Sequence, residues 1–327
     1  MTGRLFTCGL LIVALQAGPA SAADTPVAEV SQLRLYSSFW QNLHHFLYVS
    51  AWATRPAGGR GRLAMPMPEG SAVTLTGEEK ATWDKAVAIY EREFASRDLL
   101  FDFGMGRIKR GLVDRDDQLT GAPFDDELKN LLLSASPIYR KYWWPTHDAA
   151  NRAWVADAVR RTTKYAPPII ERLTALYRVS WFSAPVRVDV VRVGKSQGAY
   201  TSNNPTHIVV ASDDKSYNQW ASTEMLFHES SHGLIQNVMT AVNAALAASK
   251  KQAPILWHVV LFYIAGEVTR QQLMKDGIDY KQYLYATGLF DRVWPQFRAP
   301  VEMHVQAYID AKTTLEQMAT NLAAAVP

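Results

Sequence analysis

The chain has 327 residues, of which 48% are hydrophobic and 20% are charged, a composition typical of a globular protein rather than of a long disordered chain. Lys and Arg number 34 against 31 Asp and Glu. The net charge of +3 therefore gives no electrostatic reason to expect a nucleic acid as partner. No repeat of fixed period is evident, which argues against a solenoid or a propeller.

Residues 1–22 have the pattern of a secretory signal. Arg4 supplies a positive charge, an apolar run covers Leu5 to Leu15, and Ala20-Ser21-Ala22 gives the small residues of a cleavage site. We therefore expect a periplasmic or secreted mature chain that begins at Ala23, with an uncleaved anchor as the alternative. The only cysteine, Cys8, lies inside this segment, so we expect neither disulfides nor thiol chemistry in the mature chain. No later stretch has the length of a stable membrane span.

The first half of the mature chain is predicted to be mainly helical. Apolar residues at helical spacing predict a helix over 31–53, and a loop rich in Gly and Pro follows at 55–70. Thr76 with Glu79 forms a capping box that opens a helix ending near Phe94.

The next segment, 100–124, is rich in Gly and Asp and is predicted to be a loop. Three further helices are expected before residue 180, with Pro167 and Pro168 separating the last two. They are placed at 125–134, 148–164 and 168–178.

Two strands are predicted in the second half of the chain. β-Branched residues at 186–193 and 207–211 favour strands, and the pattern after Asp213 is helical to the end. The chain is therefore expected to be α+β and predominantly α-helical, with a small β-sheet. A boundary near 180 would divide it into an N-terminal helical region, 23–180, and a catalytic region, 181–327, although both can form one compact domain.

The segment 225–234 contains the pattern His228-Glu229-x-x-His232. On a helix the two histidines lie about 40° apart and can bind one tetrahedral Zn²⁺, while Glu229 projects about 100° from His228. Glu229 would thus lie beside the metal, where a general base for a water molecule is needed. Apolar residues such as Leu226 and Phe227 fall on the other side of the helix and can be buried.

This segment resembles the active-site helix of zinc metallopeptidases of the zincin superfamily. The resemblance implies a zincin-like fold, a Zn²⁺ cofactor and a peptide or protein substrate. It also implies that the strand before the helix, here 207–211, is a sheet edge that pairs with the substrate. The metzincin form requires a Gly and a third His soon after His232, and Ile235 and Val238 occupy those positions.

The resemblance is therefore to the gluzincin plan, in which a later helix supplies a Glu as third ligand. Glu267 is the candidate, because its helix face is otherwise apolar and a metal would stabilise a carboxylate there. An ion pair with Arg270 is the alternative explanation for Glu267. His258 is the rival third ligand, on the opposite side of the same helix.

Other residues are weaker candidates. Glu224, one turn before His228, can orient a ligand histidine or line the cleft rim. His44 and His45 are adjacent and chelate one metal poorly, so one is expected to be buried and the other to face a cleft. A donor to the transition state is also expected, and the sequence does not choose among its candidates. These are Tyr263, Tyr280, His304 and Tyr308.

Three functions are compatible with these patterns. The first is a secreted zinc metallopeptidase, with His228, His232 and Glu267 as metal ligands and Glu229 as catalytic base. The second is a zinc hydrolase of a non-peptide bond that uses the same residues. The third is a helical periplasmic binding or scaffold protein in which the motif is incidental or stores a metal without catalysis, and the ten tryptophans form a binding surface. The oligomeric state is not encoded in any of these patterns.

Overall fold

The computed structural model of the chain describes residues 24–53, 67, 70–194 and 198–327. The predicted secretory signal and most of the predicted loop at 55–70 lie outside these residues. The fold is α+β and predominantly helical, as predicted, with one small mixed sheet. No helix of the described part combines the length and the apolar character that crossing a bilayer requires.

The sheet has five strands in the order β1-β2-β3-β5-β4. Strands β2, β3 and β5 run parallel, whereas β1 and β4 are antiparallel to their neighbours and lie at the two edges. The expected strand at 207–211 is present as β5, but it pairs on both sides, so the prediction that it is a sheet edge is wrong. The strands are β1 (Ala28–Val30), β2 (Leu33–Tyr36), β3 (Val186–Val191), β4 (Ala199–Ser202) and β5 (His207–Ala211).

Each face of the sheet supports its own hydrophobic core. Val188 and Val190 of β3 point into one core with the C-terminal helices, while Val191 and Val209 point into a second core with the N-terminal helices. This alternation follows from the two-residue period of a strand, because both faces of a central strand are buried. The sheet thus joins residues from both sides of position 180 in one structure.

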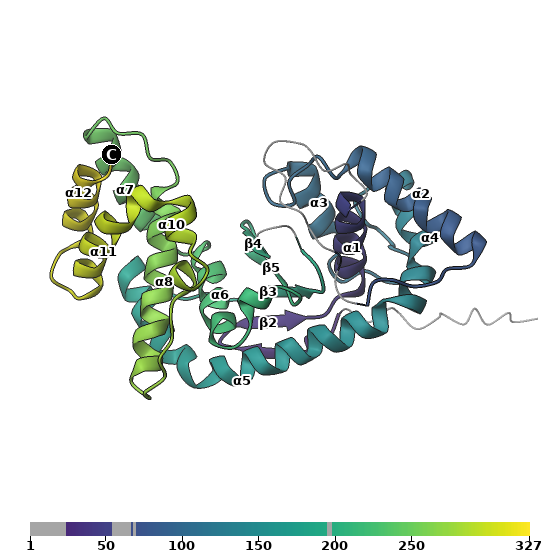
Figure 1. Cartoon of the computed structure of the whole chain (residues 1–327), viewed down its shortest axis with the longest axis horizontal. Coiled ribbons are helices and arrows are strands. Elements are labelled where there is room, and N and C mark those ends of the chain that lie inside the picture. Colours follow the sequence, from purple (N-terminus) through teal and green to yellow (C-terminus); the bar gives the residue numbers. More distant parts are fainter. Residues whose placement is uncertain (1–23, 54–66, 68–69, 195–197) are drawn as a thin grey trace, which may run out of the picture.

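Helices of the N-terminal half cover one face of the sheet (Figure 1). They are α1 (Phe39–Ala53), α2 (Gly77–Glu93), α3 (Phe103–Gly111) and α4 (Asp126–Tyr142). The Thr76 capping box at the start of α2 is confirmed, because the Thr76 hydroxyl accepts a hydrogen bond from the Glu79 amide and the Glu79 carboxylate accepts one from the Thr76 amide.

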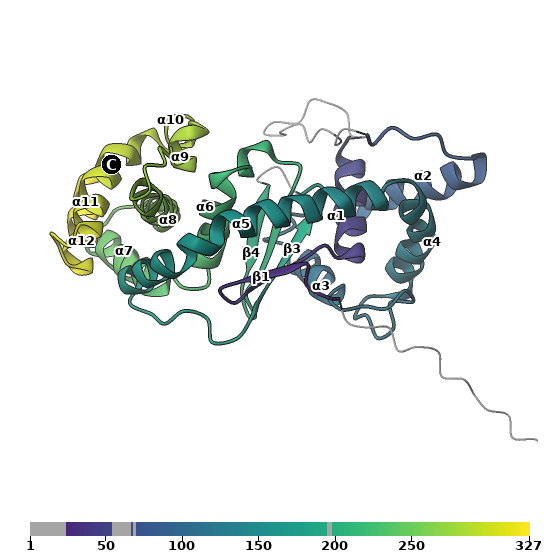
Figure 2. The ribbon, with the colours of Figure 1, turned by 90° about the horizontal axis from the view of Figure 1, so that it is seen from below.

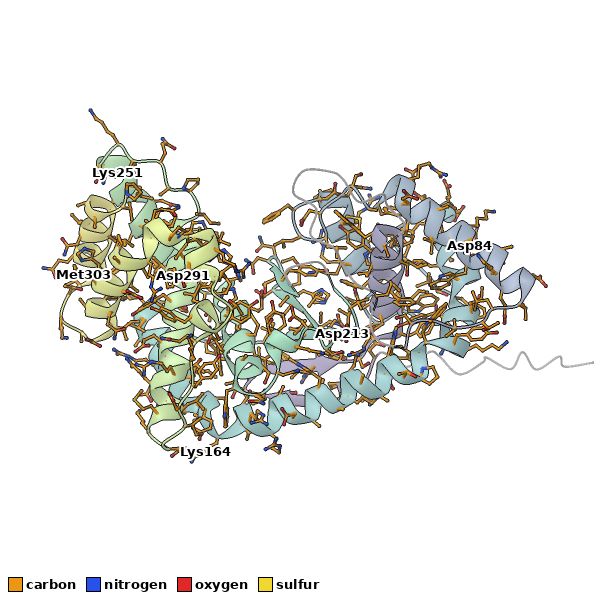
Figure 3. All side chains as sticks on the ribbon, viewed as in Figure 1. Asp84, Lys164, Asp213, Lys251, Asp291 and Met303 are labelled. Carbon is orange, nitrogen blue, oxygen red and sulfur yellow. The ribbon has the colours of Figure 1, made fainter. Side chains whose placement is uncertain are left out.

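Helix α5 (Trp144–Tyr177) runs along the sheet and links the two helical groups, as the two perpendicular views show (Figures 1 and 2). Asp84 and Met303 lie on the outer sides of these groups, and Asp213 lies between them (Figure 3). The C-terminal group begins with the short 3₁₀ helix η1 (Lys215–Tyr217). Its α-helices are α6 (Trp220–Ser231), α7 (Gln236–Ala248), α8 (Leu256–Met274), α9 (Tyr283–Ala286), α10 (Leu289–Val293), α11 (Pro295–Ile309) and α12 (Leu315–Ala325).

The start of the predicted helix at 31–53 is instead a β-hairpin. Ser31 and Gln32 adopt positive φ values of 48° and 72° and reverse the chain between β1 and β2. Leu33 and Leu35 are buried while Arg34 between them is not, which is the alternation of a strand. On a helix Leu33 and Leu35 would lie about 200° apart, whereas on a strand they share one face, and β2 forms that strand by pairing with β3.

Two other predictions near the middle of the chain are wrong. Segment 100–124 contains α3, which Asp102 caps by accepting a hydrogen bond from the Met105 amide at 3.0 Å. Gly111 serves close packing here, because a Cβ at this position would lie 2.5 Å from the Phe124 ring.

Helix α5 also continues through Pro167 and Pro168 without the expected break. The two prolines leave the carbonyls of Thr163 and Lys164 without helical donors. Both residues are exposed, so water can bond these carbonyls, while Ile169 and its neighbours keep the buried face continuous.

Candidate metal centre

Helix α6 places the motif residues at the edge of the C-terminal core. Leu226 and Phe227 are fully buried in that core and fix the orientation of the helix. Ser230 and Ser231 are also buried, and their hydroxyls donate to the carbonyls of the preceding helical turn at 2.7 and 2.6 Å. Because these small polar groups are satisfied within the helix, α6 can be buried on nearly every side.

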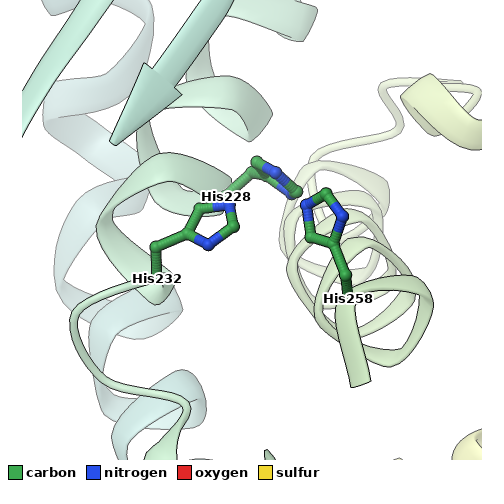
Figure 4. Close-up of side chains that lie close together, drawn as sticks. All are labelled: His228, His232 and His258. Atoms are coloured by element: carbon green, nitrogen blue, oxygen red, sulfur yellow. The ribbon is translucent and has the colours of Figure 1, made fainter. Parts of the chain in front are cut away.

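Three histidines converge between α6 and α8. His228 comes from α6, His232 caps the end of that helix, and His258 comes from the first turn of α8. Each offers a ring nitrogen, and the three nitrogens lie within 4.8 Å of one another (Figure 4). The ring centroids are 5.0 to 5.5 Å apart. No other group of three metal-ligating side chains this close is found among the described residues.

The chemistry of these rings fits a divalent metal. Nδ1 of His228 and Nε2 of His258 are buried and have no hydrogen-bond partner among the described residues. Burial holds the pKa of His228 well below its usual range, and lowers the pKa of His232 to about 4 and that of His258 to about 3. Near neutral pH all three rings are uncharged, which is the form that binds metal. A bound metal would supply the partner that the buried nitrogens lack.

Glu267 lies elsewhere. It is 3% exposed and sits on the side of α8 away from His258, as the nine-residue separation requires. Its two oxygens accept hydrogen bonds from Nε and Nη2 of Arg270 at 2.8 and 2.7 Å, and also from Gln271 and Gln282. The ion pair that the sequence offered as the alternative is therefore present. The structure groups His258, rather than Glu267, with His228 and His232.

Glu229 points toward the edge strand β4. The Oγ1 of Thr201 lies 2.6 Å from Oε2 of Glu229 and 3.0 Å from its backbone carbonyl. At the shorter distance the hydroxyl donates to the carboxylate and orients it. Thr201 was not predicted from the sequence, because the short strand β4 has no long β-branched run. Its only sequence signal is its position between Gly198 and the next strand.

A cavity of about 490 Å³ borders this centre. His232 and Trp257 form one side of it, and Asn203 and Thr206, which follow β4, form another. The ring centroids of His232 and Trp257 are 6.0 Å apart. Of the three histidines, His232 lines this space, which is large enough for several atoms of a ligand.

Glu224 is buried on the same helix but contacts the segment after α8. Its Oε2 accepts hydrogen bonds from the Tyr280 hydroxyl at 2.7 Å and from the Tyr283 amide at 3.0 Å. A Cβ at Gly266 would lie 2.9 Å from Oε1 of Glu224 and 3.1 Å from Gln282, so the glycine leaves room for these two side chains against α8. Glu224 thus ties α6 to the Tyr280–Tyr283 segment.

The free energy of unfolding should depend on the protonation of Glu224. Burial raises the pKa of its carboxyl from 4.5 to about 7. Between these pH values the folded chain keeps a proton that the unfolded chain has released, so stability falls as pH rises. We expect the unfolding free energy of the wild type, measured relative to that of Glu224→Gln, to fall by about 2–3 kcal/mol from pH 4.5 to pH 7.5. Urea unfolding at both pH values measures it.

Comparison with Glu224→Gln removes the contribution of other groups. Buried histidines have lowered pKa values and act in the opposite direction, because their contribution to stability is lost as pH falls. They are present in both proteins and cancel in the difference. A difference that stays constant across this pH range would contradict the assignment.

The remaining candidates lie in other surroundings. His44 and His45 are both fully buried and bonded to the hydroxyls of Tyr90 and Tyr200, so the expectation that one faces a cleft is wrong. The hydroxyl of Tyr280 is bonded to Glu224, as described above. Two other predicted donors also have hydroxyls bonded within the protein, Tyr263 to Gln306 and Tyr308 to the Leu176 carbonyl. His304 is partly exposed on α11.

Comparison of the chain with protein-family models, with curated proteins and with solved structures gives no match. The function must therefore be argued from the site itself.

Proposed function

We propose that the protein is a metal-dependent hydrolase, most specifically a zinc peptidase. The observation that carries the proposal is the convergence of His228, His232 and His258 beside Glu229. Three neutral imidazoles form a ligand set suited to Zn²⁺, with a position left for water or substrate. The ligand set differs from the one expected from the gluzincin resemblance, because His258 replaces Glu267.

The protein groups have separate roles in this proposal. A zinc ion, when bound, would polarise a substrate carbonyl and acidify a water molecule. Glu229 takes the proton from that water and later donates it to the leaving amine. Thr201 holds the carboxylate through its hydrogen bond at 2.6 Å. Phe262, whose ring centroid is 3.7 Å from that of His228, excludes bulk water from one side of the rings.

The surroundings of the site favour an extended chain as substrate. In the described sheet β4 pairs with β5 alone, so its other edge is not covered by a further strand of this sheet. An extended peptide could add to that edge through main-chain hydrogen bonds, next to Glu229 and the cavity at His232. A peptide bond is therefore the preferred substrate over a small ester or amide. The expected secretory signal would place such an enzyme in the periplasm or outside the cell.

Metal removal tests this proposal. The zinc-loaded chain is expected to cleave an unfolded protein such as reduced casein, and a chelator should abolish cleavage. Stoichiometric Zn²⁺ should restore it, because the rings need a metal to act on the substrate. Elemental mass spectrometry before and after chelation measures the metal, and gel electrophoresis measures the products. Cleavage that continues in the metal-free chain would contradict the proposal.

A further inference from the structure

A second cavity lies on the other side of β4 from the histidines. It has a volume of about 310 Å³ and is formed by α3, the residues just before it, and the end of β4. Asn203 lines both this cavity and the one that contains His232. Both spaces therefore border the end of the edge strand, and an extended ligand bound along that strand would run from one toward the other.

One residue that lines this second cavity also contacts the candidate catalytic base. Thr201 lines it, and the hydroxyl of Thr201 bonds the carboxylate of Glu229. One hydrogen bond therefore separates the cavity from Glu229. A substrate whose scissile bond lies at Glu229 and His232 would place its neighbouring residues in this space.

The lining of the cavity combines a cation with apolar walls. Arg110 is half-buried there and has no ion-pair partner among the described residues. Its Nη1 lies 3.5 Å from the point that a Cβ of Gly106 would occupy, so the guanidinium lies against α3. Phe101 and Phe103 are 83% and 80% exposed and form the wall beside it.

The one carboxylate of this lining is already neutralised. Asp102 accepts hydrogen bonds from Nη2 of Arg97 at 2.7 Å and from the Met105 amide at 3.0 Å. Its charge is balanced by Arg97 and by the start of α3, which leaves the charge of Arg110 uncompensated within the cavity. Ser202 adds a buried hydroxyl that has no hydrogen-bond partner among the described residues.

We propose that this cavity is a specificity site in which Arg110 binds a carboxylate of the substrate, close to the bond that is cleaved. The proposal rests on the peptidase function proposed above. A guanidinium binds a carboxylate through two parallel hydrogen bonds, and the exposed phenylalanine rings would cover the methylenes of the same side chain. The carboxylate can come from an internal Asp or Glu or from the free C-terminus of a peptide.

Peptide selection tests the assignment. The zinc-loaded full chain with Glu229→Gln is immobilised, so that peptides bind without being cleaved. One probe is a randomised octapeptide mixture with amidated C-termini, in which only Asp and Glu carry carboxylates. The other lacks Asp and Glu but has free C-termini, and its amidated form is the reference. Mass spectrometry identifies the retained peptides.

In one of the two mixtures, peptides with a carboxylate are expected to be enriched at least about 10-fold over peptides with the corresponding carboxamide. Adding Arg110→Gln should abolish that preference, whereas adding Arg107→Gln should keep it, because Arg107 is an exposed cation of the same helix that does not line the cavity. Three outcomes would overturn the proposal. Peptides are retained without a carboxylate preference, the preference survives Arg110→Gln, or no peptide is retained.

Cleavage by the wild-type chain separates this proposal from the peptidase function. Two matched peptides are offered to the zinc-loaded chain, one with the carboxylate that the selection identifies (side chain or C-terminus) and one with the corresponding carboxamide. Selective binding of the carboxylate peptide without cleavage of either would contradict the peptidase function and leave the carboxylate site standing. Equal cleavage of both would do the reverse.

Discussion

His258→Ala is expected to lower the affinity of the chain for Zn²⁺ by more than about 100-fold, while Glu267→Gln is expected to leave it unchanged. Loss of a residue that merely supports a ligand already costs 10–100-fold, and loss of a ligand should cost more. Both carboxylate oxygens of Glu267 accept hydrogen bonds from Arg270, Gln271 and Gln282, so its replacement should not change the affinity for Zn²⁺. Equilibrium dialysis against a competing chelator measures the affinities.

The controls for this experiment are also histidines. His228→Ala should lose the metal as His258→Ala does, because both rings belong to the same cluster. His304→Ala, on α11 and outside the cluster, should bind as tightly as wild type. Loss of zinc in Glu267→Gln together with full binding in His258→Ala would instead identify Glu267 as the third ligand, as the sequence suggested.

Glu229→Gln is expected to keep the metal and to reduce peptide hydrolysis by about 10²–10⁴-fold. A carboxamide is nearly the same size as the carboxylate but cannot accept the proton of the attacking water. The kcat of casein-derived peptide cleavage, measured beside zinc content, separates catalysis from metal binding. Full activity in this variant would contradict the assigned role of Glu229.

Thr201→Val is the companion variant for Glu229. It preserves the shape of the side chain but removes the hydroxyl at 2.6 Å from the carboxylate. We expect a smaller loss of kcat, of about 10-fold, with zinc content unchanged, because the base remains but is less well oriented. A loss as large as that of Glu229→Gln would mean that Thr201 does more than position the carboxylate.

The sequence predicted helix α6 well because its evidence is local. The polar residues His228, Glu229 and His232 and the apolar residues Leu226 and Phe227 fall on separate arcs, and one helix satisfies both sets. The choice of a third residue is not local. His258 and Glu267 lie on opposite faces of α8, a helix buried almost all round, and only its packing against α6 decides which face meets the cluster.

The elements at the edge of the site, β4 and α3, could not be predicted from local sequence patterns either. Strand β4 is too short to be recognised, and α3 contains Gly104, Gly106 and Gly111, which normally argue against a helix. At two of these positions a Cβ would be crowded, by the Arg97 guanidinium at Gly104 and by the Phe124 ring at Gly111. Such contacts are formed between segments that only the folded chain brings together.

The parallel pairing of β2 with β3 has a consequence for how the protein is made. Strand β2 is near the start of the chain, and its partner comes only after α1–α5 have been added. Contacts between such remote segments close slowly, because a long loop must be ordered before the pairing stabilises it. The sheet continues from β3 through β5 to β4, where the Thr201 hydroxyl bonds the Glu229 carboxylate. We therefore expect the nascent chain to lack the complete candidate site, and with it the proposed peptidase activity, until nearly all of it has emerged.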